Sequence, residues 1–431
     1  MHSPAKGDTD GRNTSFADLN NLWPRKGRKA GNLGLKMQQA SPEQAHDETA
    51  PARAAGIRIV PVSGRRLLRQ FIDLPAMLYR DIPTYEPPLH LDRARLLDPR
   101  RSAFCRRGIV QYWLAFRGPV TVGRISAQIA DDRPVGVPEN SGMFGCLDTI
   151  DDREVVLALV NAAEEWLRAK GCIHVHGPYM LDMLGEPGLL VYGYERAPLP
   201  PTPWHPPYLR DHVEALGYAK WQDVSYWGLD LTQYDMLRLR DKMRLKERHP
   251  RLNVRSVTWR SLRKDMPVLR DIFNDGWGNN WGHVPLSLDD MRGLKAIAPL
   301  LPPEAGRIIE LDGQPVAIHV AIPNTFELTH GLGPHPSPLG WLRLLWRVLR
   351  FRPKSGLIVL LGISSRLRFS AASAAIILTL INEMITSQEA LGIDWVEGGW
   401  VLEDNTALTK LLARFTFTIT RTYRIYDKSL V

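Results

Sequence analysis

Cysteine is scarce in this 431-residue sequence, which contains Cys105, Cys146 and Cys172. No two of them form a CxxC motif, so the sequence predicts neither a disulfide scaffold nor a cysteine-rich zinc site. Long apolar runs are also missing, since the longest (371–381) is shorter than the ~20 residues that cross a bilayer. No apolar segment follows a basic start at the N-terminus, which predicts no secretory signal. We therefore expect a cytoplasmic protein, either soluble or peripheral on the inner membrane.

Several catalytic motifs are absent as well. There is no Walker A motif, and Gly331-Leu332-Gly333 lacks the third glycine of a GxGxxG loop, so kinase and dinucleotide-binding functions have no motif support. No GxSxG elbow exists, which removes the support for a serine hydrolase. Histidines are scattered, with His174 and His176 in one segment and His330 and His335 in a Gly/Pro-rich loop. Because no HExxH or mixed Cys/His set occurs, we expect no metal.

Positive charge is in modest excess, with 55 Lys and Arg against 46 Asp and Glu and a net charge of +9. The basic residues of 238–251 raise the alternative of nucleic-acid binding. On a helix their every-second-residue spacing spreads the charge around the cylinder, and no base-reading motif accompanies it, so we expect no nucleic-acid partner. Residues 1–56 contain no valine or isoleucine and are predicted to form a disordered tail.

Short strands alternate with helices in the remainder, which predicts an α/β fold. Asp151-Asp152 is a typical N-cap for a helix that ends at Lys170-Gly171. A proline-rich break at 198–207 and a basic segment from 237 to 255 follow. The second half repeats the first in outline, with an Asp312-Gly313 hairpin turn and a long helix from Ser370 to Leu391. We expect two units, 57–235 and 236–431.

The most informative segment is the apolar strand 357–361 and the turn that follows it up to Ser373. A strand, a turn of small residues and a helix N-terminus together present free backbone N–H groups and a positive dipole, which bind phosphate. Arg366 and Arg368 add cationic donors beside that turn. The alternative, an ordinary strand-to-helix connection, fits the same residues.

Several blocks of this sequence resemble a bacterial family of tandem GNAT-like N-acyltransferases, which includes proteins resembling bacterial ceramide synthase. The resemblance extends from about Ile57 to Lys428. The blocks that carry it are Phe144-Gly145, His176-Gly177-Pro178, Gly188-Leu189-Leu190-Val191, Pro206-Pro207-Tyr208, Asn274-Asp275-Gly276-Trp277, Asn280-Trp281-Gly282-His283-Val284-Pro285, Trp400-Val401-Leu402-Glu403-Asp404-Asn405 and Thr422-Tyr423-Arg424-Ile425-Tyr426.

The resemblance implies an α/β fold of two tandem GNAT-like units with mixed β-sheets, the second of which binds acyl-CoA as co-substrate. GNAT folds hold the CoA pyrophosphate with an Arg/Gln-x-x-Gly-x-Gly/Ala loop, for which Arg368-x-x-Ala371-x-Ser373 is the best match. Neither glycine is present, which weakens this inference. A tyrosine common in these enzymes is replaced by Leu411 or Leu412. The predicted cofactor-binding residues are Leu361, Gly362, Ile363, Arg366, Arg368, Ser370, Ala371, Ser373 and Asn405.

Acyl transfer to an amine needs a proton acceptor and donors for the developing oxyanion. We nominate backbone N–H groups of 361–363 as those donors. Glu397 and Glu403 are the candidate bases, although Glu403 alternatively caps the helix that starts at Asn405. Tyr423 is the candidate acid toward the leaving thiolate, with Tyr426 as an alternative.

Five residues of the blocks within 274–285 are the candidate substrate-binding residues: Asn274, Asp275, Trp277, Asn280 and Trp281. For Asn274 and Asp275, a structural role in holding the loop together is an equal alternative. For Trp277 and Trp281, the alternative is that they anchor the hydrophobic core. The first-choice reaction is transfer of a fatty acyl group from acyl-CoA to a lipid-like amine, best a sphingoid base. Acylation of a small soluble amine and a non-catalytic scaffold remain alternatives, and the sequence leaves the oligomeric state open.

The segment Leu339 to Lys354 bears on the substrate. Arg343, Arg347 and Arg350 recur on one helical face, while Trp and Leu cover much of the rest. A basic amphipathic helix suits an anionic membrane surface, which we expect as a partner. A helix packed on the sheet fits the same pattern. Because this helix precedes the strand 357–361, we expect it to shape the acyl entrance.

Overall fold

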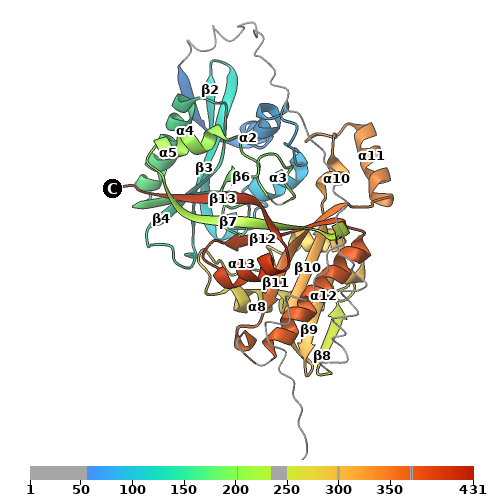
Figure 1. Cartoon of the computed structure of the whole chain (residues 1–431). Helices are drawn as coiled ribbons and strands as arrows, with labels where there is room; N and C mark the ends of the chain where they lie inside the picture. Colours follow the sequence, from blue (N-terminus) through green and yellow to red (C-terminus); the bar gives the residue numbers. More distant parts are fainter. Residues whose placement is uncertain (1–55, 201, 234–249, 299–300, 369, 371) are drawn as a thin grey trace, which may run out of the picture.

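The computed structural model describes residues 56–431 apart from 201, 234–249, 299–300, 369 and 371 (Figure 1). The predicted tail (1–56) therefore lies outside the described residues except for Gly56. The predicted boundary between residues 235 and 236, and most of the basic segment 237–255, also lie outside them.

Strands and helices alternate through both halves of the chain (Figure 1). The first half contains β1 (Ile57–Pro61), α2 (Gly64–Leu78), α3 (His90–Leu97), β2 (Gly108–Arg117), β3 (Val120–Ala130), β4 (Ser141–Thr149), α4 (Arg153–Ala169), β5 (His174–Tyr179), β6 (Leu189–Tyr192), α5 (Tyr208–Ala215) and β7 (Ala219–Asp230). The second half contains β8 (Leu252–Ser256), α8 (Leu262–Trp277), α9 (Arg292–Ile297), β9 (Gly306–Leu311), β10 (Gln314–Pro323), α10 (Phe326–Thr329), α11 (Pro338–Leu349), β11 (Ser355–Ile363), α12 (Ser373–Leu391), β12 (Trp395–Leu402), α13 (Thr406–Arg414) and β13 (Thr418–Ser429).

Local sequence signals that predicted element ends are confirmed. The carboxylate of Asp152 accepts hydrogen bonds from the N–H groups of Glu154 and Val155 at the start of α4, and Gly171 beyond its end has a φ of +84°. Asp312 and Gly313 both have positive φ, as a tight hairpin turn requires, and they join β9 to β10.

A single mixed sheet runs through the described residues in the order β1-β2-β3-β4-β5-β13-β7-β12-β11-β10-β9-β8. Each half contains four antiparallel strands, a crossover helix and a parallel strand: β1-β2-β3-β4-α4-β5 and β8-β9-β10-β11-α12-β12. The final strands are exchanged, because β7 pairs with β12 of the second half and β13 pairs with β5 of the first. The two repeats therefore share one continuous sheet.

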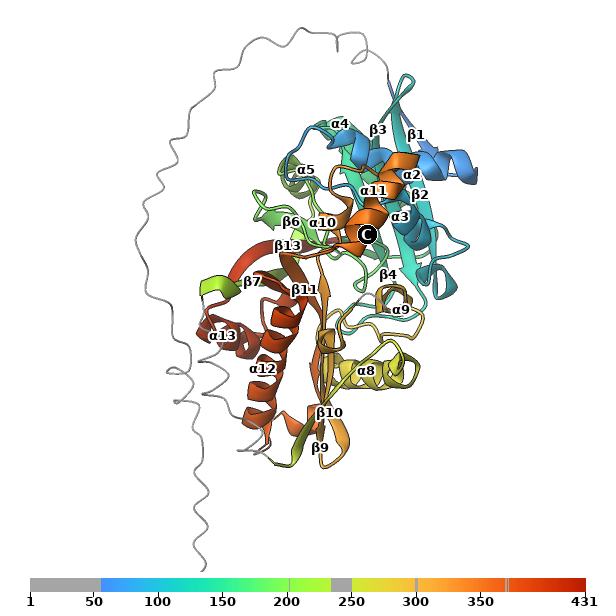
Figure 2. The ribbon, with the colours of Figure 1, turned by 90° about the vertical axis from the view of Figure 1, so that its right-hand side faces the viewer.

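Helices cover both faces of this sheet. Figure 2 shows α12 and α8 on opposite sides of β9 and β10. Ile376 and Leu380 of α12 pack with Ile309 and Ala317, whereas α8 packs with a cluster that includes Ile318. The alternation along β9 and β10 thus buries both faces of that part of the sheet.

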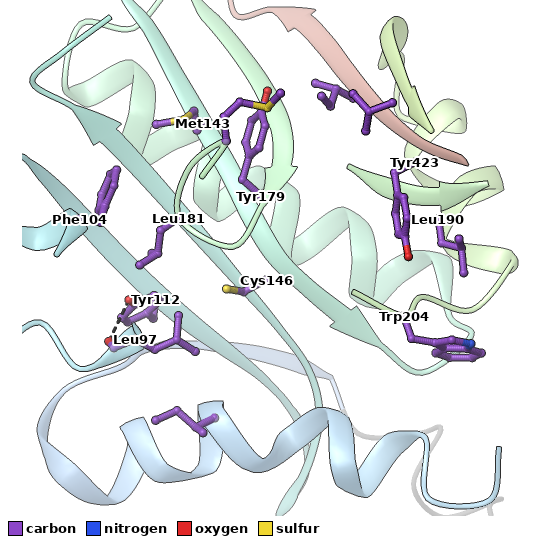
Figure 3. Packing of buried hydrophobic residues seen from close by; sticks show 14 of the residues in the cluster. Leu97, Phe104, Tyr112, Met143, Cys146, Tyr179, Leu181, Leu190, Trp204 and Tyr423 are labelled. Carbon is purple, nitrogen blue, oxygen red and sulfur yellow. Dashed lines mark hydrogen bonds between the residues drawn. The ribbon is translucent and has the colours of Figure 1, made fainter. Parts of the chain in front are cut away.

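The largest core of the first half lies between α2, α3 and the sheet (Figure 3). There the Tyr112 hydroxyl donates to the Leu97 carbonyl at 3.0 Å, which satisfies a buried polar group. Tyr423 of the last strand belongs to the same core, close to Leu190 (Figure 3). The chain's final strand thus helps to complete the hydrophobic core of the first half.

Candidate acyl-CoA site

A large cavity of about 730 Å³ lies in the second half, between α12, α13 and the sheet. Its size falls within the roughly 300–1,000 Å³ of small-molecule sites. The wall is mostly apolar. Of its polar residues, Arg368, Ser370 and Ser373 gather where α12 begins, whereas Asn280, Asn405 and Gln388 lie elsewhere on the wall. A molecule with an anionic end and a long apolar part would match this distribution.

One face of α12 forms a wall of the cavity along most of the helix. The lining residues on this helix are Ser373, Ile377, Leu380, Ile381, Met384, Ile385 and Gln388. Their spacing of three and four residues places them on one side of an α-helix. At 1.5 Å per residue, the stripe is about 22 Å long. The cavity is therefore elongated and has room for an extended chain.

The strands β11 and β12 diverge beside this cavity. They pair in parallel from Ser355↔Trp395 to Ile358↔Gly398, after which the described residues show no further pairs between them. Val359 is a bulge residue, because Leu360 pairs with Val320 and Ile358 with Ala321. The edge of β11 beyond the bulge therefore presents backbone groups that β12 does not engage.

A second cavity of about 200 Å³ occupies this divergence. It shares the lining residues Trp277, Leu361, Met384, Leu408, Leu412 and Phe417 with the larger cavity. Among its described lining residues are also Phe273, Trp400 and Tyr226 but no carboxylate or imidazole. The two cavities meet at the carboxyl end of β11, where the predicted oxyanion donors lie.

The N-terminus of α12 is available to an anion. Its N-cap is Ala372, which provides no side-chain cap, and no acidic residue occurs in the first turn. The helix has 19 residues, so the aligned peptide dipoles favour negative charge at this end. Arg368 is exposed nearby and lines the cavity. This end of the cavity can therefore hold a pyrophosphate.

Asp275 braces the turn that leads from β11 to α12. Its carboxylate accepts hydrogen bonds from the Ser364 hydroxyl at 2.7 Å and from the N–H and hydroxyl of Ser365 at 2.9 and 2.6 Å. Partial burial alone would raise the pKa of Asp275, but these hydrogen bonds lower it below its ordinary 3.8. The residue is ionised at neutral pH and stitches the loop, the second of the two roles considered for it.

Nine of the residues nominated from the sequence line the larger cavity: Leu361, Gly362, Ile363, Arg368, Ser370, Ser373, Asn405, Trp277 and Asn280. Asn405 also accepts a hydrogen bond from Leu408 N–H and so caps α13. Trp277 is a cavity wall held in place by its Nε1–H, which donates to the Leu361 carbonyl at 2.7 Å. Arg366 is exposed and lines neither cavity, and Ala371 lies outside the described residues.

The remaining nominated substrate residues have other contacts. The Asn274 side chain exchanges two hydrogen bonds with the backbone of Leu286, at 2.8 and 3.0 Å, and so fixes the loop after α8. Trp281 packs edge-on against Trp221 of β7, with ring centroids 5.0 Å apart. Neither residue lines the two cavities. Their positions correspond to the structural alternatives stated for them.

The two nominated bases lie away from both cavities. Glu397 is fully buried and forms an ion pair with Arg421, with Oε2 and Nη1 2.7 Å apart. Both of its oxygens accept from Arg421, and Oε1 also accepts from Trp395 Nε1–H. Glu403 accepts from Lys220 and from Asp223 N–H, so it ties β12 to β7 rather than capping α13. We therefore do not carry either residue into the proposed catalytic set.

Tyr423 lines neither cavity, although its ring packs against Tyr226 of the second one, with centroids 5.6 Å apart. It is fully buried, and its hydroxyl donates to the Pro203 carbonyl at 2.9 Å within the core of the first half (Figure 3). Burial raises its pKa above the usual range, which makes it a poor proton donor. Tyr426, the alternative acid, donates to Glu214 and lines neither cavity.

The sequence did not point to most of the apolar residues of the cavity wall, nor to His283 as a residue of the site. The α12 stripe and the α13 residues Leu408 and Leu411 were visible as apolar helical positions, but core packing produces the same periodicity. In the sequence, His283 stood out only as part of the block 280–285 that resembles the family. Its ring lies against Phe273 of the second cavity, with centroids 6.3 Å apart. Burial lowers its pKa below the ordinary 6.5, so the ring is neutral at neutral pH and can accept a proton.

Helix α11 lies on the outside of the molecule beside α3 and α10 (Figure 2). Its Leu344 and Val348 face a hollow shared with Leu89 and Leu96 of the α3 region. No described residue of α11 lines either of the two cavities, so the expectation that it shapes the acyl entrance is wrong. None of the helices in the described part of the chain has the length and apolar character that crossing a membrane requires.

Fold, exchanged strands and cavity define a protein of the tandem GNAT acyltransferase class. A tandem GNAT protein from the clavulanic acid biosynthesis pathway superposes with a TM-score of 0.52 and 14% identity, covering 87% of this chain and 99% of that one. This likeness shows the fold.

Two curated proteins are closer in sequence. Bacterial ceramide synthase of Caulobacter vibrioides (strain NA1000 / CB15N) is 33% identical over 379 residues, covering 87% of this chain and 98% of that protein. Protein YghO of Escherichia coli (strain K12) is 33% identical over 368 residues, covering 84% and 93%. No family model matches. The chain belongs to the family that contains these two proteins.

Proposed function

We propose that this protein transfers a fatty acyl group from acyl-CoA to the amine of a lipid, with a sphingoid base as the first choice. The observation that carries the proposal is the elongated, mostly apolar cavity that has Arg368, Ser370 and Ser373 at the uncapped start of α12. The CoA pyrophosphate would bind the helix N-terminus and Arg368, and the apolar wall would receive the acyl chain. The name of the Caulobacter relative supports the choice of amine.

Acyl transfer from a thioester to an amine requires few catalytic side chains. The neutral amine attacks the thioester carbon, the C–S bond breaks as the amide C–N bond forms, and one amine proton finally resides on the CoA thiol. In this proposal, backbone N–H groups of Leu361 to Ile363, beyond the bulge at Val359, stabilise the oxyanion, which their position on the cavity wall supports. His283 is the candidate proton acceptor. It lines neither cavity itself, but it is neutral and its ring contacts Phe273 of the second cavity.

A membrane surface is the proposed source of the amine. The outer face of α11 exposes Leu339 and Leu349 at 77% each, Leu342 at 63% and Trp346 at 56% of their surface. Arg350 lies over the Trp346 ring at 5.2 Å, so a cation borders the apolar face. Leucine, tryptophan and arginine on one exposed helix suit the boundary between headgroups and acyl chains of an anionic bilayer.

The test is a coupled assay with purified full-length protein. Long-chain acyl-CoA and a sphingoid base should yield free CoA thiol and the matching amide by mass spectrometry. If a panel of lipid amines gives no thiol whereas small soluble amines do, the substrate class is wrong. If no amine gives thiol and CoA does not raise the melting temperature, the protein is a non-catalytic scaffold.

A further inference from the structure

Three side chains from distant parts of the sequence converge outside the acyl-CoA site. Asp73 lies on α2, His90 begins α3, and His335 belongs to the loop before α11. His90 Nδ1 lies 2.6 Å from Asp73 Oδ1, and His335 Nε2 lies 2.8 Å from Asp73 Oδ2. The two imidazole rings are neighbours tilted against each other, with centroids 4.6 Å apart and an interplanar angle of 31°. Both rings therefore direct a nitrogen at one carboxylate.

The geometry points to a binding site for a divalent transition metal of the zinc type, with Asp73, His90 and His335 as its ligands. One ligand atom from each residue lies within 4.8 Å of the other two. Two ligands on one zinc ion, each at about 2.1 Å, lie at most about 4.2 Å apart, so small side-chain movements bring all three into range. Two imidazoles and one carboxylate form a donor set that such metals prefer over Mg²⁺ or Ca²⁺, which favour oxygen ligands.

The surroundings leave room for the ion and its remaining ligand. Asp73 and His90, but not His335, line a hollow of about 70 Å³, which is large enough for several water molecules. Arg69 is the competing cation, with Nε 3.5 Å from Asp73 Oδ2. Its side chain is 66% exposed and can move into solvent when a metal neutralises the carboxylate. His90 N–H donates to the Pro334 carbonyl at 2.9 Å, which keeps the two histidine-bearing segments in register.

The metal would act as a clasp between the two repeats. Asp73 and His90 belong to the first half of the chain, whereas His335 lies three residues before α11 in the second half. Coordination would fix the segment that carries α11 against α2 and α3. A neighbouring pair, His330 with Glu86 at 2.8 Å, joins the same segments, but no third metal-ligating side chain joins it among the residues that the structure describes. That pair provides a matched control for the clasp.

The test titrates ZnCl₂ into untagged, chelator-stripped full-length protein in a calorimeter. The wild type and His330→Ala should bind one Zn²⁺ saturably, and MgCl₂ should give no such signal. His335→Ala, and independently His335→Gln, should weaken zinc binding at least about 10-fold. Both histidines are largely exposed, at 41% for His335 and 78% for His330, so these variants should fold. Absence of saturable binding in the wild type, or equal affinity in the His335 variants, overturns the site.

Limited trypsin digestion tests the clasp without any catalytic readout. Zinc should slow cleavage at the arginines of 343–352 in the wild type and in His330→Ala, but not in His335→Ala. Unchanged cleavage in zinc-loaded wild type would overturn the clasping role. Acyl transfer is not measured here, so failure of this proposal is distinct from failure of the proposed function.

Discussion

Arg421 on β13 and Glu397 on β12 form a buried ion pair across the intervening strand β7. Their side chains are 2% and 1% exposed, and Arg421 also donates to the Ala197 carbonyl at 2.8 Å. Trp395 donates to Glu397 and crosses Gly228 of β7, where a Cβ atom would lie 2.3 Å from the indole ring. The pair thus joins β12 to β13, the two strands that flank the exchanged strand β7. It depends on Gly228 of β7, because a side chain at that position would collide with Trp395.

This pair gives the first prediction. Arg421→Met should lower the free energy of unfolding by about 3–5 kcal/mol, because it leaves a carboxylate buried without its partner. The double variant Arg421→Met/Glu397→Leu should recover most of that loss, as measured by urea denaturation. If the double variant folds and still transfers acyl groups, Glu397 is structural. A single variant that costs less than about 1 kcal/mol would contradict the buried pair.

His283 is the subject of the second prediction. His283→Gln should lower kcat about 100-fold while leaving the KM for acyl-CoA nearly unchanged, because a proton acceptor acts in the chemical step. Steady-state kinetics of thiol release would measure both quantities. His330→Gln is the control, since this exposed histidine pairs with Glu86, and neither residue lines either of the two cavities. An unchanged kcat in His283→Gln would remove the residue from the mechanism.

The third prediction concerns the α12 stripe. Ile381→Trp should block part of the elongated cavity, so long-chain acyl-CoA should lose activity while short-chain acyl-CoA is spared. Each methylene group denied burial costs about 0.8 kcal/mol, and two of them about 10-fold in kcat/KM. Ile381→Val is the matched control, because it only widens the cavity. Equal losses for all chain lengths in Ile381→Trp would place the acyl chain elsewhere.

Membrane association through α11 is the fourth prediction. Leu342→Glu/Trp346→Glu should reduce flotation with anionic liposomes by about 100-fold or more, because burial of each side chain contributes about 1.5–3 kcal/mol. Leu157→Glu on α4 alters another exposed leucine, at 41%, and should float as the wild type does. High salt should weaken the wild-type interaction. Flotation of the double variant at the wild-type level would exclude α11 as the contact.

The fifth prediction is a pH dependence of stability. His319 of β10 is fully buried, and neither ring nitrogen has a partner in the described part of the chain. Burial, with a smaller effect of Arg307, lowers its pKa from 6.5 to about 3. The unfolded state therefore binds more protons below pH 6.5, and stability falls as the pH falls toward 3.

Between pH 7 and pH 5 this single group should account for about 2 kcal/mol of lost stability. His319→Leu should remove that part of the slope, as measured by denaturant unfolding at several pH values. His212 is partly exposed and paired with Asp151, so His212→Leu is the comparison. An identical pH slope for wild type and His319→Leu would contradict the assignment.

Patterns within single elements could be predicted from the sequence. The Asp152 cap, the Asp312-Gly313 turn and the β11–turn–α12 segment follow from backbone conformation and local hydrogen bonding, which neighbouring residues decide. The predicted CoA-binding loop belongs to this group, and most of its described members do line one cavity. The repeated order of strands was visible for the same reason.

Contacts between distant segments depended on the tertiary structure. Strand exchange brings Arg421 to Glu397. The carboxylate that the sequence suggested as a catalytic base is therefore part of a buried ion pair. The Asp73–His90–His335 cluster spans more than two hundred residues of sequence, so no spacing motif could reveal it. Hydrophobic periodicity likewise cannot distinguish apolar residues that pack in the core from apolar residues that line a cavity, because both occupy one face of a helix. The sequence by itself determined the elements and the family, whereas the packing of one half against the other decided which side chains face the cavity.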